Sequence, residues 1–440
     1  MKKTFKITTF QIIFIGFFGL ILLGSLLLCL PVSSAEHCFT PFLDCAFTAT
    51  SAVCVTGLIV RDTATYWSAF GRTLIIILIQ IGGLGVVTVA LALSIFSGRK
   101  ITLGQRSLMQ ESVSADRVGG IVRLTSFILK FTFGVELIGA FLMAPAFCRD
   151  FGFLKGSLYA LFHSVSAFCN AGFDLMGVRE PFSSFTSYET DILINVVLMG
   201  LILIGGIGFR TWEDIGKYRF RIREYRLQSK MILTAALILF LLPAIYYFFF
   251  EFSDMAIGER LLASCFQSVT TRTAGFNTVN EDALTESGKL VTILLMLIGG
   301  APGSTAGGMK TTTVFVLVAS AMDVFRRQDH ADLFGRRIEA EIIRRAAAIL
   351  IMYLILFLGT GMIISRIEEI PLLTCLFETA SAIGTVGITL GITPQLGTFS
   401  RLLLMALMFF GRVGGLTIIF AAFSGKRKQL NYPREDVSVG

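Results

Sequence analysis

Charged side chains are scarce in this chain of 440 residues, since Asp, Glu, Lys and Arg together make up 15% of it. Soluble domains average about 25% charged residues. Hydrophobic residues reach 54%, 41 residues are phenylalanine, and the mean hydropathy is +0.76. A water-soluble core does not need that much apolar surface. The composition therefore excludes a soluble globular protein and predicts an integral membrane protein.

Residues suited to metal binding or nucleophilic catalysis are also few or poorly spaced. The three histidines, His37, His163 and His330, fall in different parts of the chain, and the eight cysteines include no CxxC pair. These patterns disfavour a zinc site, a disulfide framework and a Ser-His catalytic set, so we expect no enzyme activity. The net charge of +8 is spread between apolar stretches, which is typical of loops beside anionic lipid. We expect a lipid bilayer and no nucleic acid as partner.

Four short windows of the chain are nearly alike. Each begins with Phe, continues through small and hydroxyl-bearing residues, and ends at a glycine followed by an apolar residue. The windows are residues 47–58, 162–173, 266–276 and 377–388. Four Gly-ended segments can surround one axis with their backbones facing a common centre, which is how an ion selectivity filter is built. The alternative is four Gly-ended turns in helix-packing loops.

The predicted filter consists of the glycine that ends each window and the two residues before it. An unpaired carbonyl in hydrocarbon is costly, and a cation in a water-filled path supplies the missing partner. Glycine permits a backbone conformation that a side chain would block. The predicted ion-binding residues are Val55, Thr56, Gly57, Asn170, Ala171, Gly172, Thr273, Ala274, Gly275, Thr385, Val386 and Gly387.

Apolar stretches long enough to cross a bilayer flank each window, one before and one after it. They are residues 10–30, 73–97, 124–147, 192–209, 231–250, 290–322, 346–365 and 402–425. This order predicts an all-α membrane protein with four tandem helix–pore loop–helix repeats, eight transmembrane helices in all, arranged pseudo-fourfold around a central pore. The expected repeats are 1–110, 111–226, 227–335 and 336–440.

Lys and Arg gather at the N-terminus, in each connection between repeats and at the C-terminus. The positive-inside rule makes these segments cytoplasmic, so we expect a multi-pass protein of the cell (plasma) membrane with both termini inside. The first apolar run, residues 10–30, is long for a signal peptide and suits a first membrane helix. A signal peptide cleaved near Ala35 is the alternative.

A Gly-Gly pair follows each window within the next apolar stretch, at 82–83, 205–206, 299–300 and 414–415. In the third repeat the pair opens a segment with five glycines and one proline, which cannot stay a regular helix. We expect this inner helix alone to be heavily broken, with a loop at mid-membrane that acts as a gate. The predicted gate residues are Gly299, Gly300, Ala301, Pro302, Gly303, Ser304, Thr305, Ala306, Gly307, Gly308, Met309, Lys310 and Arg412.

Three charged residues of the apolar stretches leave alternatives open. Arg412 either sets an electrostatic barrier under the filter or pairs with the C-terminus of a helix. Lys310 either positions the loop or extends to the cytoplasmic interface. Glu378 is either a hydrogen-bonded structural residue or one that tunes the charge of the filter.

The Gly-rich segment also comes close to the pattern of a phosphate-binding loop. Gly303 and Gly308 have the required spacing, but Met309 displaces Lys310 by one position and no strand precedes the segment. We therefore expect no nucleotide on this chain.

Taken together, these motifs closely resemble the Trk/Ktr/HKT superfamily of potassium transporters. The resemblance is carried by SVSAFCNAGFD at 164–174, SVTTRTAGFNT at 268–278, the GGAPGSTAGGMKT loop from residue 299, and Arg412 before a Gly-Gly pair. It covers almost the whole chain. Because no extra helices precede the first repeat, the chain looks more like the membrane (pore) subunit of a Ktr-type K⁺ uptake system than the longer Trk type.

This resemblance implies potassium transport through one central pore in each subunit, with K⁺ bound at the filter residues. It also implies a homodimer that docks onto a cytoplasmic ring of nucleotide-binding regulatory subunits. Ktr systems are often sodium-dependent, so Na⁺ is an expected activator. Glycine at all four filter positions favours potassium, because some sodium-selective relatives carry serine in the first. The third window is one residue shorter, which makes its pore helix an imperfect equivalent of the others.

Two functions fit this pattern. One is a channel-like subunit that passes dehydrated K⁺ down its electrochemical gradient. The alternative is a sodium- or proton-coupled transporter with alternating access, in which broken helices usually occur as matched pairs in two halves. A single heavily broken inner helix beside four matching windows favours the channel-like pore.

Overall fold

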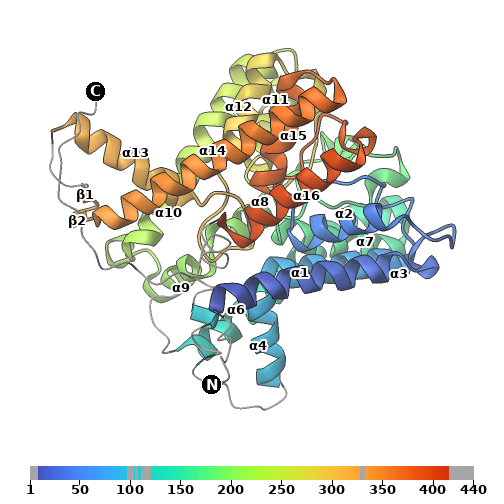
Figure 1. Ribbon diagram of the computed structural model, residues 1–440, viewed down its shortest axis with the longest axis horizontal. Coiled ribbons are helices and arrows are strands. Elements are labelled where there is room, and N and C mark those ends of the chain that lie inside the picture. The colour runs from blue at the N-terminus through green and yellow to red at the C-terminus, as the bar shows by residue number, and fades with distance from the viewer. Residues whose placement is uncertain (1–7, 97–103, 105–107, 111–119, 328–331, 416–440) are drawn as a thin grey trace, which may run out of the picture.

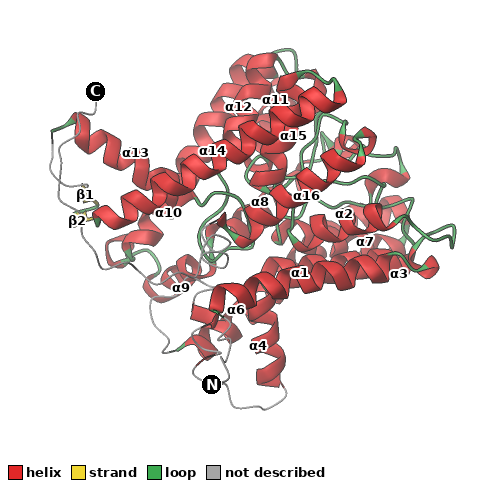
Figure 2. Ribbon diagram, in the orientation of Figure 1, coloured by secondary structure: helices red, strands yellow, loops and turns green. Residues whose placement is uncertain are grey.

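The computed structural model describes residues 8–96, 104, 108–110, 120–327 and 332–415. This part of the chain is mostly helical, with irregular loops between the helices (Figure 2). Its two short strands, β1 (Asp332–Leu333) and β2 (Arg336–Arg337), pair antiparallel. The basic clusters predicted at the two termini lie outside the described residues, as does most of the cluster between the first two windows.

Four long helices precede the four windows. They are α1 (Thr9–Leu28), α6 (Ile121–Phe151), α10 (Leu227–Tyr246) and α14 (Ala340–Glu368). Each is apolar and long enough to cross a membrane, and a π-helical turn, Tyr247–Glu251, continues α10. The start of α1 is fixed by a capping box, in which Thr8 N–H donates to Gln11 Oε1 at 2.9 Å while Thr8 Oγ1 accepts from Gln11 N–H.

A short helix and then an inner helix follow each long one (Figure 1). The short helices are α2 (Phe42–Val53), α7 (Phe153–Phe168), α11 (Ile257–Thr270) and α15 (Leu372–Gly384). The inner helices are α3 (Ala69–Leu84), α8 (Ile192–Ile207), α12 (Glu286–Met296) and α16 (Thr398–Val413). Single 3₁₀ turns occur in the connections, at Pro31–Ser33, Met176–Val178, Thr186–Tyr188, Ile222–Glu224, Glu281–Ala283 and Thr393–Gln395.

Each inner helix stops at or near a glycine. The chain turns by 94° between α3 and α4 (Val86–Phe96) and by 95° between α8 and α9 (Phe209–Tyr218). Gly85 and Gly208 connect these pairs with φ of +85° and +93°, a conformation that glycine adopts without the strain of a side chain. The expectation that only the third inner helix is heavily broken is therefore wrong. In the described residues four helices, or six if each bent pair is one span, could cross a membrane.

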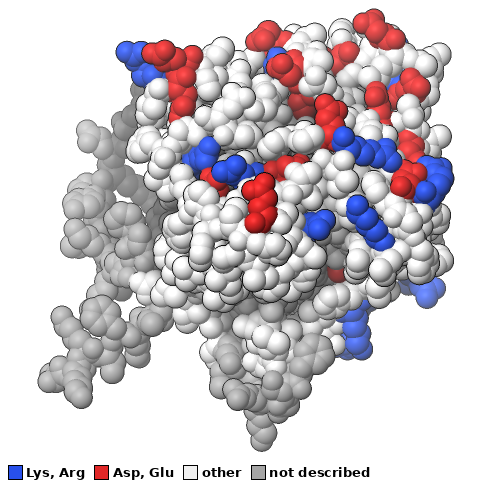
Figure 3. Space-filling view, turned by 90° about the vertical axis from the view of Figure 1, so that its right-hand side faces the viewer, with Lys and Arg blue, Asp and Glu red and all other residues white. Residues whose placement is uncertain are grey.

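The third inner helix ends at Met296, and α13 (Thr311–Phe325) begins after an irregular segment. Helix α13 and the β1–β2 hairpin project to one side of the molecule, at the left of Figure 1. The opposite end of the molecule carries charges of both signs, separated by broad uncharged areas (Figure 3). Many large apolar side chains are exposed in the described residues, Phe141, Phe153 and Phe250 among them, which is typical of a protein surrounded by lipid.

The core of the molecule lies around the four short helices. The Phe that begins each window, at positions 47, 162, 266 and 377, is buried, and three of the four are fully buried. Burying a Phe side chain contributes about 1.5–3 kcal/mol. The repeated Phe thus fixes each short helix against its neighbours.

A carboxylate joins the first short helix to the last inner helix. Asp44, in the first turn of α2, lies 2.9 Å from Arg61 Nε and 2.9 Å from Arg401 Nη1 on α16. Its side chain is 7% exposed. We expect Asp44→Asn to lower the free energy of unfolding by about 2 kcal/mol, because each hydrogen bond to a charged group contributes about 1.5–3 kcal/mol.

Thermal unfolding of the purified protein in detergent measures this change. The control is Glu341→Gln, which breaks an exposed pair with Arg345 and is expected to cost no more than about 0.5 kcal/mol. Equal shifts in both variants would show that the Asp44 pair does not join α2 to α16 energetically.

Candidate functional site

The four window glycines share one backbone conformation. Their φ angles are positive, at +92° for Gly57, +68° for Gly172, +80° for Gly275 and +99° for Gly387. Two residues earlier, a non-glycine residue also has positive φ in every window. These four residues are Val55, Asn170, Thr273 and Thr385. Non-glycine residues rarely adopt this conformation, so its recurrence at one position indicates a common local structure.

The same glycines lie against one another in a fixed order. A Cβ added to Gly57 would lie 2.6 Å from the carbonyl oxygen of Ala171, and one added to Gly172 would lie 2.8 Å from that of Ala274. A Cβ at Gly275 would clash with the carbonyl oxygen of Val386, and one at Gly387 with that of Thr56. Each window thus touches the next, and the fourth touches the first. The ends of the four windows form a closed ring.

The two carbonyls that precede each glycine receive no hydrogen bond from the part of the chain that the structure describes. Val55, Thr56 and their counterparts in the other three windows are buried, and within the described residues their eight main-chain oxygens accept no hydrogen bond. Buried carbonyls are almost always paired. Eight unpaired carbonyls around one ring are suited to hold a cation, because each can supply an oxygen ligand.

A hydroxyl group inside each short helix holds the backbone of the window. Ser51 Oγ accepts from Gly57 N–H at 3.0 Å, and Ser381 Oγ accepts from Gly387 N–H at 2.9 Å. Ser166 and Thr270 instead donate to the carbonyls of Phe173 and Phe276, both at 2.7 Å. The hydroxyl always lies four residues after the window Phe. The missing residue of the third window therefore falls between Thr270 and Gly275.

The predicted gate segment, residues 299–310, packs directly against the ring. Thr305 Oγ1 donates to Phe168 O at 2.9 Å, at the end of the second short helix. A Cβ on Gly307 would clash with the side chain of Thr385 in the fourth window. The backbone of the segment also bonds to two inner helices, through Ala301 N–H to Gly206 O and Gly308 N–H to Gly411 O. Residues of the second window, the fourth window and the segment 299–310 thus meet beside the ring.

Two residues of this segment bond within it. Lys310 Nζ donates to Ala306 O at 2.8 Å, and Ser304 Oγ donates to Ala301 O at 2.6 Å. The lysine ammonium is therefore held by the loop's own backbone. In the described part of the chain the Ser304 hydroxyl bonds to this carbonyl alone, and it lacks the adjacent base that a nucleophile requires.

Arg412 bridges the segment 299–310 and the helix α3. Its guanidinium donates to the carbonyls of Gly82 and Gly83, the latter at 2.9 Å, and to Thr305 O. The first two carbonyls belong to the last turn of α3, where the helix dipole favours a cation. The side chain therefore meets both a helix C-terminus and the loop.

The packing of the inner helices corrects the predicted Gly-Gly pair of the fourth repeat. A Cβ on Gly82, Gly205 or Gly411 would clash with the carbonyl at the end of its own short helix, at Val53, Phe168 and Ile383. Gly411, rather than Gly414, is thus the counterpart of Gly82 and Gly205, whereas Gly299 lies against the carbonyl of Gly307. Arg412 consequently occupies the place of Gly83 and Gly206, directly beside the ring.

A buried polar residue follows the Phe of each window, and of these four only Glu378 was singled out from the sequence. These four residues, Thr48, His163, Gln267 and Glu378, are buried. His163 Nε2 accepts from Leu175 N–H at 2.9 Å, Gln267 Nε2 donates to Glu281 Oε2 at 2.8 Å, and Glu378 accepts from Thr389 and Thr393. Three of the four thus hold the segment after their window. Aligning the four windows would have revealed these residues, because each one directly follows the Phe of its window.

The buried carboxyl group of Glu281 should make the stability of the protein depend on pH. It lies outside the membrane-spanning helices, and burial raises its pKa from an ordinary 4.5 to about 8, although the bond from Gln267 opposes this shift. Between these values the folded protein binds more protons than the unfolded chain. The free energy of unfolding should therefore fall as the pH rises from about 4.5 to about 8, by up to about 1.4 kcal/mol per pH unit.

We expect Glu281→Gln to flatten this slope, whereas Asp282→Asn, at an exposed carboxylate, should leave it unchanged. Thermal unfolding of the wild type and both variants at pH 5, 6, 7 and 8 measures the slope of stability against pH. A slope that persists in Glu281→Gln would assign the pH dependence to another group.

Comparison with known proteins identifies the family. The profile of the TrkH family, described as a cation transport protein, matches residues 8–429. The chain is 37% identical to the potassium/sodium uptake protein NtpJ of Enterococcus hirae, covering 100% of this chain and 99% of that protein. It is 38% identical to the Ktr system potassium uptake protein B of Bacillus subtilis, covering 100% and 98%.

The fold has a solved counterpart. The crystal structure of the potassium transporter TrkH from Vibrio parahaemolyticus aligns with a TM-score of 0.74 at 18% identity, covering 95% of this chain and 86% of that one. The predicted resemblance to the Trk/Ktr/HKT superfamily is thereby confirmed. The chain belongs to the TrkH family of cation transport proteins, which are membrane transporters rather than enzymes.

Proposed function

We propose that this chain takes up potassium across the cell membrane through a filter formed by the four window ends. The observation that carries the proposal is the closed ring of windows, whose eight buried carbonyls accept no hydrogen bond within the described residues. Relatives named for potassium uptake support the choice of ion. The windows and their flanking helices are then four repeats around one pore, with the boundaries predicted from the sequence.

Potassium would shed its hydration water at the ring, where carbonyl oxygens replace it. The four short helices end beside the window carbonyls, so their C-terminal dipoles add partial negative charge. Binding that is spread over several weak sites lets the ion leave again. Glycine at the end of each window keeps side chains out of the space that neighbouring carbonyls occupy.

The segment 299–310 would close the path beneath the ring. Its contacts with the fourth window and the bridge from Arg412 support this role. Arg412 would both hold the segment and place a positive charge in the path of a cation. Lys310 would stabilise the segment through Ala306.

The wider assembly is part of the same proposal. A relative that is named as a component of a Ktr system supports a cooperating regulatory subunit. We place two copies of this chain on a cytoplasmic nucleotide-binding ring, with both termini on the cytoplasmic side and no nucleotide on this chain. The name of the relative from E. hirae supports Na⁺ as a second relevant ion.

Uptake of Rb⁺ by cells that lack their own potassium uptake tests the function directly. Cells that express the chain should grow at limiting K⁺ and accumulate Rb⁺ despite excess Na⁺, and Gly275→Ser should lose this preference. Absence of uptake under all conditions would refute the proposal. Unitary currents would distinguish channel-like flux from coupled transport, which predicts a fixed stoichiometry in vesicles.

A further inference from the structure

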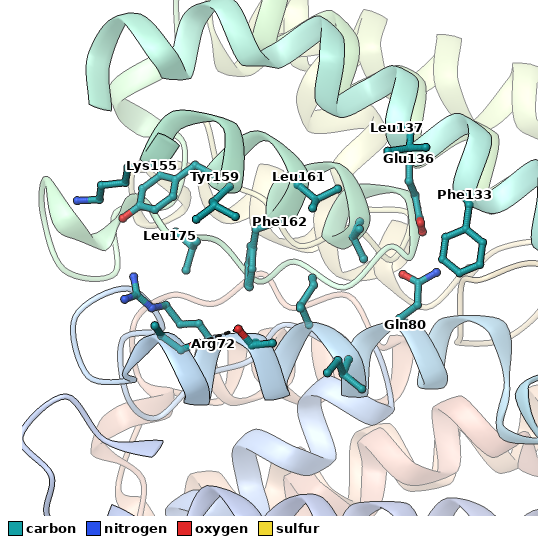
Figure 4. A pocket seen from close by; sticks show the side chains of 16 residues that line it. Arg72, Gln80, Phe133, Glu136, Leu137, Lys155, Tyr159, Leu161, Phe162 and Leu175 are labelled. Atoms are coloured by element: carbon teal, nitrogen blue, oxygen red, sulfur yellow. Dashed lines mark hydrogen bonds between the residues drawn. The ribbon is translucent and has the colours of Figure 1, made fainter. Parts of the chain in front are cut away.

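A cavity of about 710 Å³ lies between α3, α6 and α7, outside the ring of windows (Figure 4). Its walls are apolar, with Ile76, Phe133, Leu137, Leu161 and Phe162 among its lining residues. Figure 4 shows two cationic side chains, Arg72 and Lys155, toward one end and Gln80 with Glu136 toward the other. The cavity is thus long, apolar along its sides and polar at both ends.

The cavity opens between side chains that face outward from the protein. Leu137 and Leu158 line it and are 63% and 60% exposed, and Phe153 and Leu154 at the start of α7 are 82% and 75% exposed. A soluble protein does not expose a patch of this kind without a partner. In a membrane transporter such side chains face hydrocarbon, so the cavity is accessible from the lipid.

No carboxylate of the described residues pairs with the two cations at its end. Arg72 Nε donates to the main-chain oxygen of Ser68, and Lys155 Nζ lies 5.4 Å from the centre of the Tyr159 ring. Neither side chain makes an ion pair in the described ranges of the chain. Both belong to the first turn of a helix longer than eight residues, so both helix dipoles add positive potential at this end.

We propose that this cavity binds a phospholipid with an anionic headgroup. The phosphate would lie between Arg72 and Lys155, and one acyl chain would follow the apolar walls toward Gln80. The positive charges at the cationic end favour an anionic headgroup over a neutral one. The apolar, outward-facing rim favours a lipid over a soluble anion. On the topology proposed above, this lipid belongs to the outer leaflet.

The far end of the cavity connects it to the ring of windows. Cys169 Sγ lies 3.8 Å from Gln80 Oε1 and 3.9 Å from Glu136 Oε1, and Cys169 directly precedes Asn170 of the second window. An acyl chain that reaches Gln80 would pack against the side chains that contact Cys169, next to this window. Bound lipid would thereby stabilise the window from behind.

Native mass spectrometry of the full-length protein tests the binding. The protein is purified in detergent and supplied with phosphatidylglycerol or phosphatidylcholine that have identical acyl chains. We expect retention of phosphatidylglycerol, and we expect the double variant Arg72→Gln/Lys155→Gln to weaken it about tenfold, because each cation near an anionic headgroup contributes roughly a tenfold factor or less. Arg366→Gln, at the end of α14 and outside this cavity, is the matched control.

A second variant keeps both cations and fills the cavity. Leu158→Trp should displace the lipid as well, so the inference does not depend on one variant folding. Equal retention of the two lipids, or undiminished retention of phosphatidylglycerol in both variants, would overturn it. Lipid retention is measured without transport, so its failure is distinguishable from failure of the proposed function.

Discussion

Replacing Gly387 with alanine is expected to reduce K⁺ uptake about tenfold or more and to weaken discrimination against Na⁺. The residue has φ of +99°, and a Cβ there would clash with the carbonyl oxygen of Thr56 in the neighbouring window. One of the two must move, which opens the ring at the point where the fourth window meets the first. A change of only about 1.4 kcal/mol in relative binding already alters selectivity tenfold.

Gly391 provides a matched control for this experiment. It also has a positive φ, of +84°, but apart from its chain neighbours no atom of the described residues lies within 4 Å of the position of its Cβ. Gly391→Ala therefore imposes similar backbone strain a few residues away without touching the ring. Rb⁺ uptake with and without competing Na⁺ compares the two variants. If both lose uptake equally, strain rather than displacement of the Thr56 carbonyl explains the loss.

Removal of the Arg412 guanidinium is expected to raise cation flux. Arg412→Gln would break the bonds to Gly82, Gly83 and Thr305, which tie the gate segment to α3. Bonds to charged groups contribute about 1.5–3 kcal/mol each, so losing even one shifts the closed–open equilibrium about tenfold toward open. Rb⁺ efflux from vesicles in the absence of a regulatory partner measures this shift.

Arg412→Lys separates two explanations of such an increase. Lysine keeps the positive charge, but its single ammonium cannot reach carbonyls on both α3 and the gate segment as a planar guanidinium does. If charge forms the barrier, the lysine variant should stay closed; if the bridge holds the segment, it should leak like Arg412→Gln. Wild-type flux in both variants would exclude Arg412 from gating.

The long helices were predictable because an apolar run of about 20 residues is typical of a helix that crosses a membrane. The bends after α3 and α8 were not. Gly85 and Gly208 each lie inside an apolar stretch, and one glycine costs a helix only about 1 kcal/mol, so the sequence pattern does not reveal a turn of more than 90°. Packing of the gate segment against Gly205 and Gly206 accompanies the second bend.

The glycines of the candidate site were visible in the sequence, whereas their neighbours in space were not. Repetition identified the windows, but their order around the ring depends on contacts between residues more than 100 positions apart. The Gly-Gly pair of the fourth repeat was aligned three residues too late, because Gly414-Gly415 resembles the other pairs more than Gly411-Arg412 does. Only the contacts of Gly82, Gly205 and Gly411 with the ends of their own short helices show the equivalence.

The position of a bound alkali ion tests the central claim most directly. Crystals soaked in Rb⁺ and measured at its absorption edge would locate the ion by anomalous scattering. The account predicts a peak inside the ring, within coordination distance of the carbonyl oxygens of Thr56, Ala171, Ala274 and Val386. A ring without a peak, combined with a Rb⁺ site elsewhere along the transport path, would contradict it.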